Sequence, residues 1–337
     1  AAGQIEQWYG PQRPNHFSST FLRADSLGPR TIPELQSIIA DTAYNDLVRA
    51  TSAWYLGQFR TRESLDILEG FIHDPSPLVR NSVARALAAF PPEMKRLPLQ
   101  DALDDSIRSV RLAAAEGLSE FSVQDIAFHL KEAFQTAIEE YETYLATNQY
   151  FPRGQMNLGQ YYEKRGEVDR AMEAYRKAIE KDNHFNAARI NLAYLYNQRG
   201  ENQEAERLLQ TVIGQEPSYG PAHYSLALLL AEMNRIADAL PHFEQAASLM
   251  PNHHRVRYNW AISLQRLNRP EDAEQAYLEA IRIAPENPDY RYGICTLYIQ
   301  QQQFAQARTH VQQLIDLDPD NQRYRQLENM IRERLNN

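Results

Sequence analysis

Apolar and small residues recur with a strict period of 34 residues in the second half of the chain, from about residue 152 to residue 321. In each unit a large apolar residue directly precedes a small one, and an alanine lies twelve positions after the small residue. The pairs are Leu158-Gly159, Leu192-Ala193, Leu226-Ala227, Trp260-Ala261 and Ile294-Cys295, and the later alanines are Ala171, Ala205, Ala239, Ala273 and Ala307. Because antiparallel helices approach closely only where a small side chain faces a large one, the pattern predicts five consecutive helix pairs.

Residues that stop helices mark the ends of these units. The residues between the two helices of a unit are Gly166, Gly200, Asn234 and Asn268, and the prolines near the unit ends are Pro217, Pro251, Pro285 and Pro319. A left-handed residue closes the first helix, and proline prevents continuation into the next unit. Units of this kind resemble tetratricopeptide repeats (TPRs), which implies a right-handed superhelix. After the last unit, an apolar stripe that includes Leu327 and Ile331 predicts a capping helix.

A shorter period of 31 residues organises the first half of the chain. The runs LVRATSAWYLGQF, LVRNSVARALAAF and SVRLAAAEGLSEF align without gaps, and each follows a shorter amphipathic stretch. Each unit is therefore predicted to be another helix pair. These units resemble HEAT repeats. In such repeats the arginine after valine, here Arg49, Arg80 and Arg111, pairs with the acidic loop of its own or the neighbouring unit, and we expect that structural role here.

The segment between the two repeat systems contains neither proline nor glycine and shows helical spacing. We therefore expect a packed bridging helix rather than a flexible linker. Its Ala137 and Tyr141 look like the small and aromatic positions of a TPR second helix that lacks its partner. The sequence thus predicts an all-α fold, an α-solenoid of HEAT-like helix pairs followed by a TPR superhelix. Its predicted parts are an N-terminal strap and entry segment (1–30), three HEAT-like repeats (31–125), the bridging helix (126–150) and five TPRs with a capping helix (151–337).

Composition and motifs mainly exclude classes of function. The net charge of −9 and the absence of a basic run argue against nucleic-acid binding. No stretch reaches the roughly 18 apolar residues that a membrane span needs. The single cysteine, Cys295, occupies a small-residue position, where a buried apolar role is expected rather than a reactive thiol. The sequence has no phosphate-binding glycine loop, nucleophile elbow, cysteine pair or zinc motif, so it predicts neither an enzyme nor a metal site.

The TPR resemblance implies a concave groove lined by the first helix of each pair, with the fifth, sixth and ninth positions facing a ligand. Amides there can pair with the backbone of an extended peptide, and tyrosine rings supply contact area. The candidate groove residues are Arg153, Asn157, Asn191, Tyr194, Tyr224, Arg255, Tyr258, Asn259 and Tyr292. Tyrosine and asparagine are also common at these positions in the family, so they fit a groove without a selected ligand as well. Pro221 and Ser225 stand where a carboxylate-clamp groove would need basic side chains.

The opening stretch QWYGPQRPNHF has no helical or strand periodicity. This strap, followed by HEAT-like units and then TPRs, resembles the C-terminal arm of a family of bacterial multihaem c-type cytochromes, in which haem-binding Cys-x-x-Cys-His sites end upstream of a Trp-Tyr-Gly-Pro segment. The resemblance implies that Trp8, Tyr9, His16 and Phe17 dock the solenoid on a preceding haem domain. The alternative is that the strap only caps the first HEAT-like unit of its own chain.

Two functional hypotheses follow. The first is a non-catalytic protein interaction scaffold, the haem-free arm or partner of an extracytoplasmic multihaem cytochrome electron-transfer system. The alternative is a stand-alone TPR adaptor that binds extended peptide segments in its groove. The chain has no Cys-x-x-Cys-His motif, so haem c is expected only on an upstream domain or a partner, and no cofactor on this chain. The family resemblance alone implies a periplasmic or extracellular location. Since the chain begins AAGQ without an initiator Met, we expect a piece of a longer protein rather than a cleaved mature protein.

Overall fold

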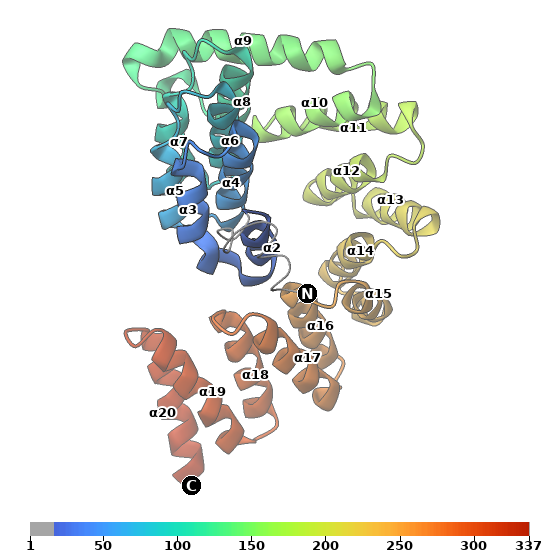
Figure 1. Cartoon of the computed structure of the whole chain (residues 1–337). Coiled ribbons are helices and arrows are strands. Elements are labelled where there is room, and N and C mark those ends of the chain that lie inside the picture. Colours follow the sequence, from blue (N-terminus) through green and yellow to red (C-terminus); the bar gives the residue numbers. More distant parts are fainter. Residues whose placement is uncertain (1–16, 337) are drawn as a thin grey trace, which may run out of the picture. The chain divides into compact units, whose positions relative to one another are not determined.

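The computed structural model describes residues 17–336, and the regular structure within this range is helical, with no β-strand (Figure 1). This confirms the predicted all-α solenoid. The packing of the helices divides the chain into unit 1, which ends at Ala174, and unit 2, which begins at Tyr175. Each unit has its own buried apolar core. The predicted boundaries near residues 30, 125 and 150 stay sequence predictions.

Unit 1 begins with an entry segment and three HEAT-like helix pairs. The entry segment is α2 (Phe17–Leu27) with the 3₁₀ turn η1 (Gly28–Thr31), and the pairs are α3 (Ile32–Ala40) with α4 (Asp46–Phe59), α5 (Arg62–Glu69) with α6 (Pro77–Ala88), and α7 (Pro92–Gln100) with α8 (Arg108–Leu118). The second helices α4, α6 and α8 pack on one another in chain order. Ala53, Ala84 and Ala115, which the 31-residue period aligns, are fully buried at these contacts. The period therefore marks the face that successive units share.

A ladder of arginines ties each HEAT-like unit to the next. Arg49 binds Asp74 with both terminal guanidinium nitrogens, and the Nη1 to Oδ1 distance is 3.1 Å. Arg80 binds Asp105 through Nε at 2.6 Å, and Arg111 binds Glu140 through Nε at 2.9 Å. Asp74 and Asp105 lie in loops of the following units, which confirms the pairing expected for Arg49 and Arg80. The partner of Arg111 is structural too, but it lies within the bridging helix and not in an acidic loop. Planar guanidinium groups bind carboxylates in two places at once, so the ladder also fixes the angle between neighbours.

The bridging helix α9 (Lys131–Asn148) begins five residues later than the predicted 126. The 3₁₀ turns η2 (Val123–Asp125) and η3 (Phe128–Leu130) precede it. Two side chains hold this backbone out of an α-helix: the Asp125 carboxylate accepts the Ser122 N–H at 2.9 Å, and Gln100 Oε1 accepts the Ala127 N–H at 2.7 Å. These bonds offer the backbone an alternative to helical hydrogen bonds, which outweighs the helical spacing of residues 126–130.

Helix α9 contacts one kind of repeat on each side. Towards α8 it supplies Glu140 to the arginine ladder. Towards α10 (Pro152–Lys164) it presents Tyr141, whose buried ring meets the Tyr161 ring edge-on at 5.7 Å. Ala137 is fully buried, as the small position of a TPR second helix should be. The helix α11 (Val168–Lys181) follows α10 and crosses from unit 1 into unit 2.

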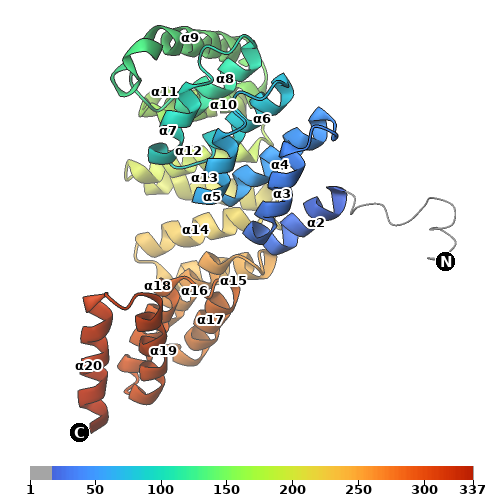
Figure 2. The ribbon, with the colours of Figure 1, turned by 60° about the vertical axis from the view of Figure 1, so that its left-hand side comes forward.

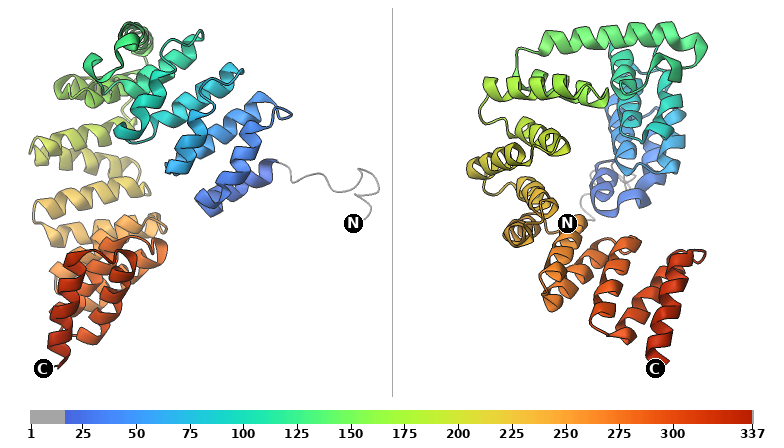
Figure 3. Two further views of the ribbon diagram at one scale, coloured as in Figure 1. Left: turned by 90° about the vertical axis from the view of Figure 1, so that its left-hand side faces the viewer. Right: turned by 180° about the vertical axis from the view of Figure 1, so that it is seen from behind.

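Unit 2 continues with four regular pairs and a last helix (Figure 2, Figure 3). The pairs are α12 (Asn186–Gln198) with α13 (Asn202–Gln215), α14 (Gly220–Glu232) with α15 (Ile236–Leu249), α16 (His254–Arg266) with α17 (Pro270–Ile283), and α18 (Pro288–Gln300) with α19 (Phe304–Leu317), followed by α20 (Gln322–Asn336). The small residues that the 34-residue period aligns are buried against the partner helices, and the first helices α12, α14, α16 and α18 contact one another in order. The first helices therefore form one continuous surface of unit 2.

The turns between paired helices follow the sequence signals. Gly200, Asn234 and Asn268 adopt left-handed backbone conformations, with φ of 76°, 60° and 55°. The last turn uses Gln302 in the same conformation, with φ of 62°, which the sequence did not signal. Cys295 is buried in its small-residue position, its thiol points to the Ala307 carbonyl, and burial raises its pKa to about 12. It therefore has the buried structural role that was expected.

Candidate functional site

The structure separates the predicted groove residues into several groups. Arg153 and Asn157 lie on α10 in unit 1, and the other seven lie on the first helices of unit 2. Asn157 lines a small polar cavity of about 260 Å³ with Tyr144 and Lys164, while Arg153 is exposed. Burial lowers the pKa of Lys164 at this cavity. The nine candidates therefore do not form one described site.

Asn191 and Tyr194 lie at a cleft of about 450 Å³ between α12 and α14, which we call the α12–α14 cleft. Leu209 and Leu229 form its buried apolar floor. The Tyr194 ring is 55% exposed at the rim, although its neighbours Leu192 and Leu195 are buried. Exposed aromatic rings beside an apolar floor are typical of protein recognition surfaces.

Hydrogen-bonding groups surround this floor. Asn191 and Ser225 line the cleft, and within residues 17–336 neither side chain has a hydrogen-bond partner. The only carboxylate among the lining residues is Glu232, and it accepts a hydrogen bond from Asn197 Nδ2 at 2.7 Å. The cleft therefore offers two unpaired neutral polar groups, which suit the backbone of an extended peptide, and one carboxylate whose only hydrogen-bond partner is neutral.

Tyr258 and Tyr292 line a second, shallower cleft of about 330 Å³ between α16 and α18. Gly293 is needed there, because a Cβ at this position would lie 2.5 Å from the Tyr277 ring and 3.1 Å from the Tyr258 ring. The Tyr277 hydroxyl donates to Gln265 at 2.8 Å, and Gln265 donates in turn to Gln300 at 2.6 Å. Several polar groups of this second cleft are therefore already hydrogen-bonded to one another. The guanidinium of Arg323 covers the Tyr292 ring at 4.6 Å from its centroid.

Asn259 is bonded to another of the candidate groove residues, Tyr224. Its Nδ2 donates to the Tyr224 hydroxyl at 2.7 Å, which links α16 to α14 between the two clefts. The Tyr224 ring packs against His253 and Phe243. Burial raises the pKa of Tyr224, and the nearby positive charge of Arg255 acts in the opposite direction. Tyr224 and Asn259 therefore hold two repeats together, and Arg255 is exposed beside them.

Of the predicted docking strap, Trp8, Tyr9 and His16 lie outside the described residues. Phe17 begins α2, and its ring packs against Phe21 and against Tyr44, with centroids 5.8 Å and 6.0 Å apart. The aromatic row continues with Phe21 stacked on Tyr55 at 5.1 Å. The described end of the strap therefore contacts the first HEAT-like pair of its own chain.

From the sequence, metal-ion sites and membrane spans are predicted to be absent. Among residues 17–336 no three His, Cys, Asp or Glu side chains are grouped so that they could hold a metal ion. Over the same residues, none of the helices combines the length and the apolar character that a bilayer crossing requires. A further cleft, which the sequence did not predict, lies beside α9 in unit 1, where the period changes between the two repeat systems.

Sequence profiles of known families agree with both periods. Two profiles of the tetratricopeptide repeat match, one at residues 163–230 and 272–331 and the other at residues 132–184 and 224–288. A profile of HEAT repeats matches residues 23–88 and 68–147. The chain contains HEAT repeats followed by TPRs. The two kinds of profile overlap on α9, which fits the two different contacts that this helix makes.

Several solved structures are similar to part of this chain. YrrB, a TPR protein with an unusual peptide-binding site, is 19% identical and covers 56% of this chain and 97% of its own, with a TM-score of 0.48. MamA from Desulfovibrio magneticus RS-1 is 17% identical, covers 50% and 96%, and has a TM-score of 0.47. PilF of Pseudomonas aeruginosa is 20% identical, covers 54% and 83%, and has a TM-score of 0.48. No curated protein matches the chain.

Proposed function

We propose that this chain is a non-catalytic adaptor, and that the α12–α14 cleft holds an extended segment of a partner protein. TPR folds mediate contacts between proteins, and the repeats present here favour that general role. The observation that carries the narrower proposal is the half-exposed Tyr194 ring beside a buried leucine floor. An apolar side chain of the peptide would lie between Tyr194 and Leu228, where it leaves water on most sides.

The neutral polar groups of the cleft define the rest of the ligand. The Asn191 amide can donate to a peptide carbonyl and accept from a peptide N–H at the same time. Ser225 on the opposite helix offers a second partner to the same backbone. Glu232 keeps its negative charge, because its bond to the neutral Asn197 amide does not balance it, but it is the only carboxylate among the lining residues. We therefore expect ligands that share an apolar residue in an extended segment without acidic side chains.

Selection from a random peptide display library, with the full chain as bait, tests this proposal. Selected peptides should share an apolar position, and the double variant Asn191→Ala, Tyr194→Ala should weaken their binding by about 1 to 3 kcal/mol, the usual effect of removing a buried polar partner and a ring. Asn252→Ala with Tyr219→Ala is the matched control, because both residues are exposed and outside the cleft. If the selected peptides bind the cleft variant and the control variant equally well, the proposed binding surface is wrong.

The cytochrome hypothesis stays a narrower proposal for the same scaffold. It depends on the opening segment, of which only Phe17 lies among the described residues. None of the matched profiles describes a haem protein. The natural protein purified from its source should show covalent haem absorbance, or co-purify with a multihaem protein, if this hypothesis holds, and a haem-free preparation without such a partner would contradict it.

A further inference from the structure

The joint between the two repeat systems leaves part of α9 uncovered. In every HEAT-like pair a first helix of eight or nine residues packs beside the second helix. Before α9 the corresponding segment has only the three-residue turns η2 and η3. Short 3₁₀ turns cannot cover an 18-residue helix along its length, so a gap remains beside α9.

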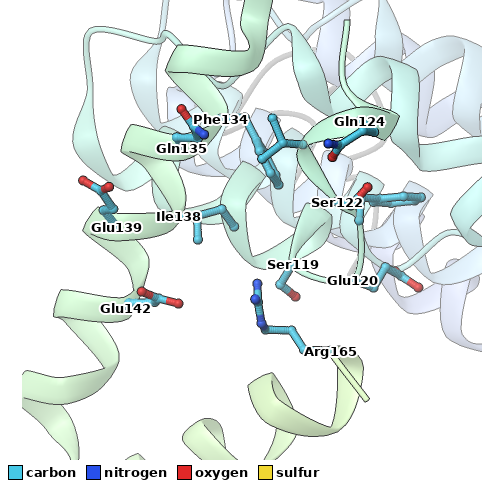
Figure 4. A pocket seen from close by; sticks show the side chains of 12 residues that line it. Ser119, Glu120, Ser122, Gln124, Phe134, Gln135, Ile138, Glu139, Glu142 and Arg165 are labelled. Carbon is cyan, nitrogen blue, oxygen red and sulfur yellow. The ribbon is translucent and has the colours of Figure 1, made fainter. Parts of the chain in front are cut away.

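This gap is a cleft of about 530 Å³, which we call the joint cleft (Figure 4). Its apolar floor consists of the buried Phe134 with the half-buried Ile138 of α9, and Phe121 and Val123 line the opposite side. All of the lining residues belong to unit 1. Apolar side chains at the bottom of an open cleft favour a ligand that brings its own apolar group.

The rim of the joint cleft carries an excess of negative charge. Figure 4 shows Glu139 and Glu142 on α9 at one side of the cleft and Arg165 at another. Glu139 has no ion pair or hydrogen bond within residues 17–336, and Glu142 accepts only a neutral hydroxyl, that of Tyr161, at 2.5 Å. Arg165 is paired with Glu167 at 2.7 Å, but Glu167 also binds Arg170, so the charge of Arg165 is only partly balanced and also acts on Glu142. Glu139 and Glu142 nevertheless form no ion pair within residues 17–336, and together they outweigh the charge of Arg165 beside the apolar floor.

We propose that the joint cleft binds a segment of a partner protein in which an apolar side chain stands next to an arginine or lysine. The apolar side chain would lie on Phe134 and Ile138, and the basic side chain would place its cation between Glu139 and Glu142. Long basic side chains suit this arrangement because their methylene stems cover apolar surface while the charged end stays hydrated. The net charge of −9 also attracts basic partners at a distance. This inference concerns another unit and another ligand chemistry than the α12–α14 cleft, and it does not depend on that site.

Fluorescence anisotropy with labelled synthetic peptides tests the proposal on the full chain. The probe is a short Gly- and Ser-rich peptide with Leu-Arg-Gly-Leu-Arg at its centre, compared with otherwise identical peptides that carry Leu-Glu or Ser-Arg in place of Leu-Arg. The Leu-Arg peptide should bind at least about tenfold more tightly than either comparison peptide, since it alone supplies both the apolar and the cationic contact. Binding should also weaken as salt is raised, because ions screen exposed charges. Equal binding of the Leu-Glu peptide would overturn the proposal.

Matched variants on α9 locate the binding site. Glu139→Gln should weaken the Leu-Arg peptide about threefold, the range of a partly exposed ion pair, and Ile138→Lys should weaken it at least about tenfold. Glu132→Gln is the control, since Glu132 is also an exposed carboxylate of α9 but does not line the cleft. Tyr194→Ala in unit 2 should leave this binding unchanged. If Glu132→Gln weakens the peptide as much as Glu139→Gln does, or if Tyr194→Ala abolishes binding, the joint cleft is the wrong site. Thermal unfolding of each variant separates loss of binding from loss of fold, and Glu139→Gln decides the outcome if Ile138→Lys unfolds.

Discussion

At the scale of single residues, the arginine ladder of unit 1 shows how burial sets the importance of an ion pair. Arg49 and Asp74 have side chains that are only 6% and 3% exposed. Arg111 and Glu140 at the other end of the ladder are 21% and 26% exposed. A buried charge that loses its partner cannot recover hydration, whereas a partly exposed one can. The same kind of ion pair should therefore contribute more to the free energy of unfolding at the buried end of the ladder than at the exposed end.

Replacing one carboxylate at a time tests this gradient. Asp74→Ala leaves the buried Arg49 guanidinium with only a long contact to the exposed Asp46 at 3.8 Å and its bond to the Ile39 carbonyl, so it should lower the free energy of unfolding by about 3 kcal/mol. Glu140→Ala should cost only about 1 kcal/mol, because water can reach Arg111. Urea denaturation of the full chain, followed by circular dichroism, gives both values. Equal costs at the two positions would show that burial does not control the ladder.

Histidines in unit 2 make stability depend on pH. Burial lowers the pKa of His242, His254 and His310, since it penalises the charged imidazolium. In the unfolded chain the same groups titrate near a pKa of about 6.5. Below that pH the unfolded chain takes up protons that the folded chain does not, so acid favours unfolding. The stabilisation is complete above this pH and is lost as the pH falls through the lower pKa values of the folded state.

Melting temperatures of the full chain should therefore decrease between about pH 7.5 and about pH 5.5, a range in which ordinary carboxylates stay ionised. His310→Gln should reduce this decrease, because His310 is largely covered and its Nδ1 has no hydrogen-bond partner. His184→Gln is the control, since His184 is exposed in a turn. A pH dependence that is the same in His310→Gln and in the parent chain would contradict this explanation.

At the scale of helices, the turn from α9 to α10 depends on one close backbone approach. A Cβ at position 154 would lie 1.7 Å from the carbonyl oxygen of Asn148. That atom is part of the backbone at the end of α9, so it cannot move aside as a flexible side chain could. Gly154 therefore fixes how α10 leaves the bridging helix, and with it the joint between the two kinds of repeat.

Gly154→Ala should lower the free energy of unfolding by roughly 2 kcal/mol or more, because the new methyl group forces the two helix ends apart. Gly214→Ala in α13 is the matched control, since a Cβ there meets no atom within 4 Å. That control should be neutral, or stabilising by about 0.5 to 1 kcal/mol, because alanine favours helix more than glycine does. Thermal melts of both variants compare the effects directly, and a tolerated Gly154→Ala would mean that the turn can rearrange.

At the scale of the whole molecule, repeats contact mainly their neighbours along the chain. A substitution in one repeat is therefore expected to change the stability of nearby repeats only. The last helix shows how the array ends. Ile331 of α20 is fully buried in the core formed with α18 and α19, whereas Leu335 on the same predicted stripe is 41% exposed. Of the apolar stripe of Tyr324, Leu327, Ile331 and Leu335 that predicts a cap, Ile331 is therefore the residue most deeply buried against the preceding pair.

Hydrogen exchange of the full chain can measure how far the cap acts. Ile331→Ala should cost about 2 to 4 kcal/mol locally and should speed backbone exchange in α18, α19 and α20. Exchange in α3 to α6 of unit 1 should stay unchanged. Leu335→Ala is the control and should have little effect anywhere. Faster exchange throughout the chain in Ile331→Ala would show that the array unfolds as one cooperative body instead.

The helices, their pairing and the contacts between successive repeats could be predicted from the amino-acid sequence alone. This was possible because those contacts repeat: a small residue such as Ala227 and a turn residue such as Asn234 recur at fixed spacing, so the period reveals the buried face and the helix end. The arginine ladder was predictable for the same reason. A periodic contact depends on residues that are close in sequence, so it can be recognised from the sequence pattern alone.

Which surface groups are free to bind a ligand became clear only from the three-dimensional fold. Asn191 and Asn259 occupy the same repeat position, yet Asn259 is bonded to Tyr224 and Asn191 is not bonded within the described residues. The joint cleft could not be predicted from the sequence either. It arises where one period ends and another begins, and a repeat pattern cannot predict a gap that occurs only once. Whether a surface group is free to bind depends on where neighbouring side chains lie in three dimensions. The buried face of a repeat, in contrast, depends only on the spacing of apolar residues in the sequence.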